Sequence, residues 1–134
     1  MYKKLALAAI EAREKAYAPY SGFKVGASLL AKNGKVFTGC NIENAAYSPT
    51  ACAERVALFK AVSEGVTDFE AIAVAGGGDS VVTTAPCGVC RQVLTEFCSP
   101  DLKVLLVSNG EGDYAETSLE QLLPLAFSET DLRG

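Results

Sequence analysis

The chain has 134 residues with 12 basic and 16 acidic side chains, which gives a formal net charge of −4. This acidic balance argues against binding to polynucleotides, which needs clustered Lys and Arg to displace phosphate counterions, and favours a small uncharged substrate. Hydrophobic residues make up 49 % and charged residues 21 %, which excludes a disordered chain. The length predicts one domain, residues 1–134, around one core.

The N-terminal segment resembles a signal peptide but is too short to be one. Lys3 and Lys4 precede an apolar run at 5–10, and charged residues follow at once. A secretory segment needs about 7–15 apolar residues, so we expect none here. Apolar residues instead recur at helical spacing, which predicts an amphipathic first helix that ends before Pro19. No apolar run is long enough to span a bilayer.

Strand and helix signals alternate along the rest of the chain. Asn33-Gly34 between the β-rich runs 23–31 and 35–39 is typical of a hairpin. A polar segment and then a helix from about 51 to 64 follow. The later predicted elements are a strand at 69–75, a loop at 76–79, a helix at 88–98, a hairpin of 103–107 and 114–117, and a final helix at 118–123 with Ser118 as N-cap. This alternation predicts an α/β architecture with helices packed on a central mixed sheet.

The cysteines indicate a metal site. Cys52 stands two residues before Glu54, and Cys87 and Cys90 are three apart. Five cysteines, an odd number, favour metal ligation in a reducing compartment, and hence a cytoplasmic protein, over a disulfide framework. Three thiolates leave the fourth tetrahedral position of Zn²⁺ open to water. Because the chain has no histidine, Glu54 is the candidate acid/base beside this zinc.

Two other interpretations of the cysteines stay open at this point. Cys40 could close the site as a fourth ligand and make it structural. Cys98 cannot, because it lies eight residues beyond Cys90 on the predicted helix, or about 12 Å away. Alternatively, Cys87 and Cys90 have the spacing of a redox dithiol, although that interpretation leaves Cys52 without a role.

Together these residues are similar to the signature of the zinc-dependent cytidine deaminases, in the small subclass with three cysteine ligands. Cys52-Ala53-Glu54 and Pro86-Cys87-Gly88-Val89-Cys90 carry the resemblance, and residues 17–27, 39–47 and 122–127 extend it over nearly the whole chain. It implies a three-layer α/β/α domain with a mixed five-stranded sheet. It also implies one Zn²⁺ per chain and a homotetramer whose active sites are shared between subunits.

The resemblance further implies an activity, the hydrolytic deamination of cytidine and 2′-deoxycytidine to uridine and 2′-deoxyuridine with release of ammonia, as in pyrimidine salvage. Glu54 would move protons from water to the ring N3 and to the departing amine. Arg55 would offset the thiolate charge through hydrogen bonds to the cysteine sulfurs. The implied substrate-binding residues are Phe23, Asn41, Glu43, Ala45, Tyr47, Ala53 and Phe127.

Several of these roles have alternatives. Asn41 and Glu43 would face the same way in an extended segment and suit ribose hydroxyls, but the same residues could form a polar turn. Phe127 would stack on a pyrimidine bound in a neighbouring chain, with Ala45 and Tyr47 approaching from another subunit. The apolar run before Phe127 could instead form a C-terminal helix that caps its own sheet.

Two other functions are compatible with the zinc signature. One is a deaminase of a cytosine nucleoside antibiotic such as blasticidin S, which the segment from Asn41 to Glu43 disfavours. The other is a zinc-stapled binding module without turnover.

Overall fold

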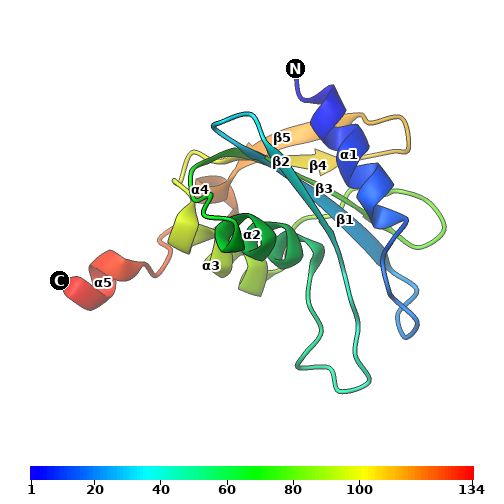
Figure 1. The fold of residues 1–134 in the computed structure, drawn as a ribbon, viewed down its shortest axis with the longest axis horizontal. Helices are drawn as coiled ribbons and strands as arrows, with labels where there is room; N and C mark the ends of the chain where they lie inside the picture. Colours follow the sequence, from blue (N-terminus) through cyan, green and yellow to red (C-terminus); the bar gives the residue numbers. More distant parts are fainter.

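The computed structural model describes residues 1–134 and centres on a mixed five-stranded sheet (Figure 1). The helices and strands, in chain order, are α1 Lys3–Arg13, β1 Lys24–Ala31, β2 Val36–Cys40, α2 Ala53–Ser63, β3 Phe69–Gly77, α3 Gly88–Phe97, β4 Lys103–Val107, β5 Tyr114–Ser118, α4 Leu119–Leu122 and α5 Glu129–Arg133. The strand order is β2-β1-β3-β4-β5. Only the β3–β4 pair is parallel. None of the helices has the length and apolar character needed to cross a membrane.

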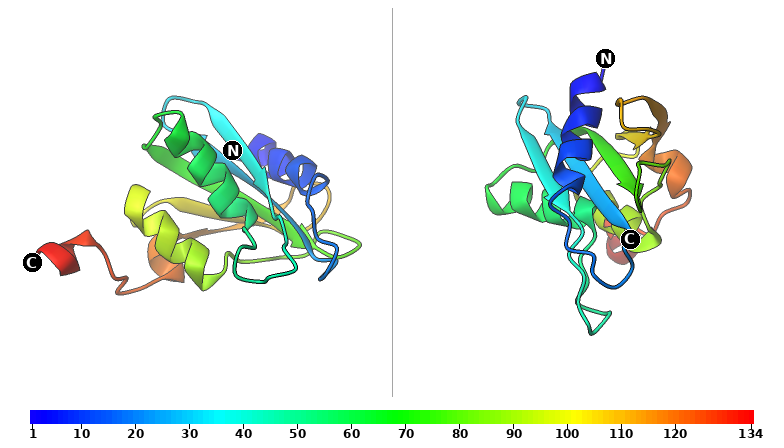
Figure 2. Two further views of the ribbon diagram at one scale, coloured as in Figure 1. Left: turned by 60° about the horizontal axis from the view of Figure 1, so that its bottom comes forward. Right: turned by 90° about the vertical axis from the view of Figure 1, so that its right-hand side faces the viewer.

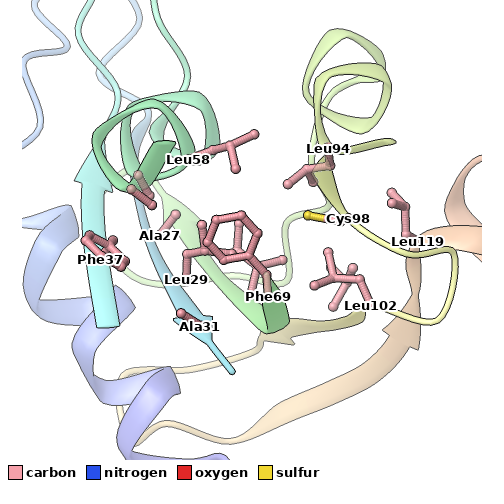
Figure 3. Packing of buried hydrophobic residues seen from close by; sticks show 14 of the residues in the cluster. Ala27, Leu29, Ala31, Phe37, Leu58, Phe69, Leu94, Cys98, Leu102 and Leu119 are labelled. Carbon is pink, nitrogen blue, oxygen red and sulfur yellow. The ribbon is translucent and has the colours of Figure 1, made fainter. Parts of the chain in front are cut away.

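Helices cover both faces of the sheet, as the predicted α/β architecture requires. Figure 2 shows α1 on one side and α2 and α3 on the other. On the α2/α3 side, Leu58, Leu94 and Leu29 belong to one buried cluster (Figure 3). Ile72 of β3 is part of the same cluster. These four side chains are almost completely buried. The face under α2 and α3 therefore contains the main hydrophobic core, and both helices are held firmly on it.

Helix α1 lies unusually close to the sheet because small residues line both sides of the contact. Ala6 and Ala9 pack against alanines of β3. A Cβ atom at Gly26 would lie 2.1 Å from the Ala9 carbonyl oxygen and 2.3 Å from the Arg13 nitrogen. Only glycine fits at this position of β1, so the close approach depends on residue 26.

The two predicted hairpins are confirmed, with Leu30 opposite Val36 in the first and Val107 opposite Tyr114 in the second. The predicted N-cap is also confirmed, because the Ser118 hydroxyl accepts a hydrogen bond of 3.2 Å from the Gln121 N–H.

Two other predictions are wrong, the end of the strand at 69–75 and the position of the last helix. Gly76 and Gly77 were expected in a loop, yet they continue β3 and pair with Val25 and Lys24. A Cβ atom at Gly76 would come within 2.7 Å of the Thr84 hydroxyl oxygen. The strand therefore has a glycine here because a side chain would clash with Thr84, and not because the backbone must be flexible.

The helix at 118–123 is also not the final one. A further helix, α5, begins after Ser128, whose side chain forms a capping box with Asp131. The spacing of Ser128 and Asp131 is the sequence signal that could have predicted it.

Candidate active site

Two helix starts on the same face of the sheet bring the cysteines together. Cys52 is the N-cap of α2 and Cys87 is the N-cap of α3, both with extended backbone. The Cys87 sulfur accepts a hydrogen bond of 3.5 Å from the Cys90 N–H. Free N–H groups and the positive end of the helix dipole stabilise thiolates at such positions. Both ligand segments therefore lie where thiolate formation is favoured.

The three sulfurs have the spacing of a metal site. The Sγ atoms of Cys52 and Cys87 are 3.7 Å apart, and those of Cys87 and Cys90 are 3.4 Å apart. All three lie within 4.8 Å of one another, and no other such group of three exists in the chain. Zn–S bonds of about 2.3 Å at tetrahedral angles place two sulfurs about 3.8 Å apart, so the thiols fit a zinc ion with little movement. Cys40 and Cys98 lie outside the group.

The charges of the thiols also favour a bound cation. A hydrogen bond from the Cys90 thiol, together with Arg55, lowers the pKa of Cys52 to about 5. The same contact and burial raise the pKa of Cys90. Cys52 therefore ionises easily while Cys90 does not, because the Cys90 proton serves the hydrogen bond to Cys52 and burial disfavours a second thiolate. A divalent cation bound to the sulfurs would favour their thiolate forms.

Arg55 lies against the first ligand. Its Nη2 donates hydrogen bonds to the Cys52 sulfur at 3.4 Å and to the Thr50 carbonyl at 3.3 Å. Its contact with the Cys52 sulfur raises the pKa of the guanidinium, which stays charged. The buried Arg55 Nε has no hydrogen-bond partner within the protomer.

Glu54 lies in the first turn of α2 and is only 4 % exposed. Burial raises the pKa of its carboxyl to about 7, and the negative charge of Cys52 adds to this shift. A hydrogen bond from its own backbone N–H acts in the opposite direction. A carboxyl with a pKa near neutrality can both take and give a proton, which is the property of a general acid/base.

The segment predicted to bind ribose is extended rather than a turn. Ile42 and Ala51 exchange backbone hydrogen bonds of 2.9 and 3.0 Å, and Tyr17 bonds to the other side of the segment. Because Ala51 directly precedes Cys52, this bridge places the segment next to the ligand helix. The buried Asn41 amide accepts a hydrogen bond from the Val25 N–H at 2.9 Å and donates one to the Phe23 carbonyl at 2.9 Å. Asn41 therefore braces the start of β1.

Glu43 is held by the loop before β1. Its Oε1 accepts hydrogen bonds from the N–H groups of Tyr20 and Ser21 at 3.0 and 3.1 Å, and its Oε2 accepts one from the Ser21 hydroxyl. The Ser21 hydroxyl lowers the pKa of this carboxyl. Glu43 and Tyr47 line a cavity of about 340 Å³ together with Thr50, whose carbonyl binds Arg55. A cavity of about 380 Å³ beside α3 and α4 contains none of the predicted site residues.

Three of the remaining predicted residues are exposed. Ala45 is exposed and Tyr47 is 81 % exposed, on the loop between β2 and α2 that projects beyond the sheet in Figure 1. Phe127 is 56 % exposed on the C-terminal segment. Ala53, by contrast, is fully buried beside Glu54 at the start of α2. Sequence reasoning missed two other residues, Arg91 and Gln92, which follow Cys90 directly and bind the C-terminal segment.

Comparison with known proteins agrees with this geometry. The family model "Cytidine and deoxycytidylate deaminase zinc-binding region" matches residues 1–106. The chain belongs to this family. It is 54 % identical over 130 residues to a cytidine deaminase of Sporosarcina psychrophila, a match that covers 97 % of this chain and 93 % of the relative.

Solved structures of the family confirm the predicted fold. The crystal structure of cytidine deaminase from Burkholderia pseudomallei superposes with a TM-score of 0.86 at 53 % identity, covering 95 % of this chain and 99 % of the other. A blasticidin-S deaminase of Bacillus cereus is 33 % identical over 110 residues, which cover 78 % of this chain and 76 % of the relative. The family's cytidine deaminases are thus the more similar group.

Proposed function

We propose that this protein, as one domain of 134 residues, hydrolyses cytidine and 2′-deoxycytidine to uridine and 2′-deoxyuridine with release of ammonia. The observation that carries the proposal is a buried carboxyl, Glu54, beside three clustered thiols, in a chain 54 % identical to a cytidine deaminase. A buried carboxyl whose pKa is raised to about 7 is typical of an acid/base site, which favours an enzyme over a binding module. Blasticidin-S deaminase is the less similar relative, so the antibiotic substrate is disfavoured.

Cys52, Cys87 and Cys90 would hold one zinc ion per chain, since their sulfurs have the required spacing. When bound, zinc supplies the Lewis acidity that activates a water molecule at neutral pH. Arg55 donates to the Cys52 sulfur and so reduces the negative charge that three thiolates place on the site.

Glu54 would carry the protons of the reaction. Its carboxylate takes a proton from the water whose oxygen forms a bond to C4 of the pyrimidine, and it gives that proton to ring N3. The proton of the new C4 hydroxyl then passes through Glu54 to the exocyclic amine, the C4–N bond breaks as the C4=O bond forms, and ammonia leaves. The raised pKa of Glu54 suits both directions of transfer. Backbone groups near Ala53 and Cys87, at the two helix starts, would hold the base.

The direct test is an ultraviolet assay of cytidine loss, with zinc measured in the same preparation. Turnover of cytidine with a much lower kcat/KM for blasticidin S supports the proposal. Zinc without turnover would identify a binding module, and preference for blasticidin S would identify the antibiotic deaminase.

Glu43 gives a prediction about the sugar. Glu43→Ala should lower kcat/KM for cytidine about 10- to 100-fold, because a ribose hydroxyl that binding removes from water would lose its acceptor. Asn41→Ala should also lower it, with a lower melting temperature, because the Val25 N–H and the Phe23 carbonyl lose their partner. Steady-state kinetics and thermal denaturation measure these effects. Equal kcat/KM of the wild type for cytosine and cytidine would show that no ribose site exists.

We further propose a cytoplasmic homotetramer that acts in pyrimidine salvage, with active sites shared between subunits. The five cysteines are all free thiols, which fits a reducing compartment. Tyr47 and Phe127 are aromatic residues that their own chain leaves largely exposed. Such residues on projecting segments are suited to a site in another copy.

Mixing two variants tests the shared site. Phe127→Ala should raise KM for cytidine strongly without loss of zinc, since an aromatic stack contributes about 0.5–1.5 kcal/mol beyond its buried area. Mixing Phe127→Ala chains with inactive Glu54→Gln chains should restore activity, because some sites then combine an intact Glu54 with a neighbour's intact Phe127. The assay uses cytidine well below the wild-type KM. Proven subunit exchange without any gain over the sum of the parents, or a fully active monomer, would exclude shared sites.

A further inference from the structure

In the C-terminal segment of residues 123–128, residues 124–127 have few hydrogen bonds that fix their backbone. The segment joins α4 to α5, which Figure 1 shows apart from the sheet. Residues 124–127 form no backbone–backbone hydrogen bond. Leu125 has a positive φ of 53° and is fully exposed, and Phe127 is 56 % exposed. Neither secondary structure nor burial therefore determines where the Phe127 ring points.

One side chain supplies the missing restraint. The Gln92 amide Nε2 donates a hydrogen bond of 2.8 Å to the Phe127 carbonyl, and no other hydrogen bond reaches residues 124–127. Its neighbour Arg91 binds the residue just before the segment, since Nη1 donates to the Leu122 carbonyl at 2.7 Å. Two adjacent residues of α3 thus bind the chain just before the C-terminal segment and at Phe127 near its end.

The same two residues connect this segment to the thiol cluster. The Arg91 Nε donates a hydrogen bond of 2.7 Å to the carbonyl of Pro86, the buried residue before Cys87. Gln92 lies two positions after Cys90 on the rigid helix α3. This hydrogen bond therefore fixes the position of the Phe127 backbone relative to α3, the helix that carries Cys90 and begins after Cys87.

We propose that Gln92 is a positioning residue for substrate binding. By fixing the Phe127 carbonyl, it aims the Phe127 ring at the pyrimidine bound in a second copy of the chain, while Arg91 anchors the chain just before the segment. This inference rests on the proposed function, in which Phe127 stacks on that pyrimidine. Gln92 itself touches neither the thiols nor the substrate in this arrangement.

Gln92→Glu tests the contact, because it keeps the size of the side chain and removes the donor. We expect KM for cytidine to rise about three- to tenfold, the change that one neutral hydrogen bond gives, with kcat and zinc content unchanged. Limited proteolysis within residues 124–127 should become faster, because the segment loses the hydrogen bond that fixes the Phe127 carbonyl. Gln92→Lys, which keeps a donor, should retain more of the wild-type affinity. The matched control is Thr95→Val, which removes the second acceptor of the Gln92 amide, at 3.4 Å, and should leave KM unchanged.

A double variant separates positioning from general support of the fold. If Gln92 acts through Phe127, then Gln92→Glu should raise KM no further in a Phe127→Ala background. Additive effects of the two substitutions on KM, or an unchanged KM in Gln92→Glu, would overturn the proposal. A lower zinc content together with a lower melting temperature in Gln92→Glu would also overturn it. If the glutamate variant does not fold, Gln92→Ala repeats the test. Absence of cytidine turnover in the wild type would instead overturn the proposed function, and the proteolysis measurement would still report whether Gln92 holds the segment.

Discussion

Glu54→Gln should lose most turnover of cytidine while it keeps its fold and its zinc. The substitution preserves size and shape in a position that is 4 % exposed, so the helix start and the thiols keep their places. An amide cannot take a proton from water, and general acid/base groups contribute about 10²–10⁴-fold to the rate. We therefore expect kcat to fall by about that factor. Steady-state kinetics, zinc analysis and thermal denaturation of the same preparation provide the measurement.

Two controls sharpen this experiment. Glu64→Gln changes a glutamate at the exposed C-terminal end of α2 and should leave kcat unchanged. Arg55→Gln should be milder than Glu54→Gln, because Arg55 acts on the charge of Cys52 rather than on the protons of the reaction. The melting temperature of Glu54→Gln should equal or exceed that of the wild type, because burial of a carboxyl costs free energy once it ionises. Near wild-type turnover in Glu54→Gln would remove this residue from the mechanism.

The thiol cluster could be predicted from sequence because each half of it is local. Cys52 and Glu54 stand at one helix start, and Cys87 and Cys90 at another, so short spacings fix each pair. The distance between the two pairs is a tertiary property. Sequence spacing alone does not give the 3.7 Å between Cys52 and Cys87, and only the demand of zinc for several thiolates suggested it.

The parts that could not be predicted depend on contacts between distant residues. Gly76 follows the pattern of a loop, but pairing with Val25 keeps it in β3. Asn41 has the spacing of a ligand-binding residue, yet both ends of its amide also bind the backbone near β1. The bond between Gln92 and Phe127 joins residues 35 positions apart, and no local pattern marks it. In each case the structure at a residue depends on a distant partner that the local sequence does not reveal.

Cys87→Ala should lose the zinc ion and with it the activity. Three sulfurs within 4.8 Å form the site, and removal of one leaves two thiolates, fewer than zinc sites normally use. Zinc analysis after dialysis against a chelator should fall from about one ion per chain to nearly none, because metal affinity depends on every ligand of the set. Cytidine turnover should become undetectable in the same preparation. Cys52→Ala and Cys90→Ala should behave alike.

Cys40→Ala is the matched control, since it removes a thiol that lies outside the cluster. Cys40 ends β2 and lines a cavity with Lys15 and Lys60 rather than with the other thiols. Its loss should leave zinc content and kcat unchanged, which would establish three protein ligands and a fourth position free for water. If Cys40→Ala lost zinc as completely as Cys87→Ala, four cysteines would close the site. Such a site has no position at which water could be activated, and the proposed deaminase activity would be wrong.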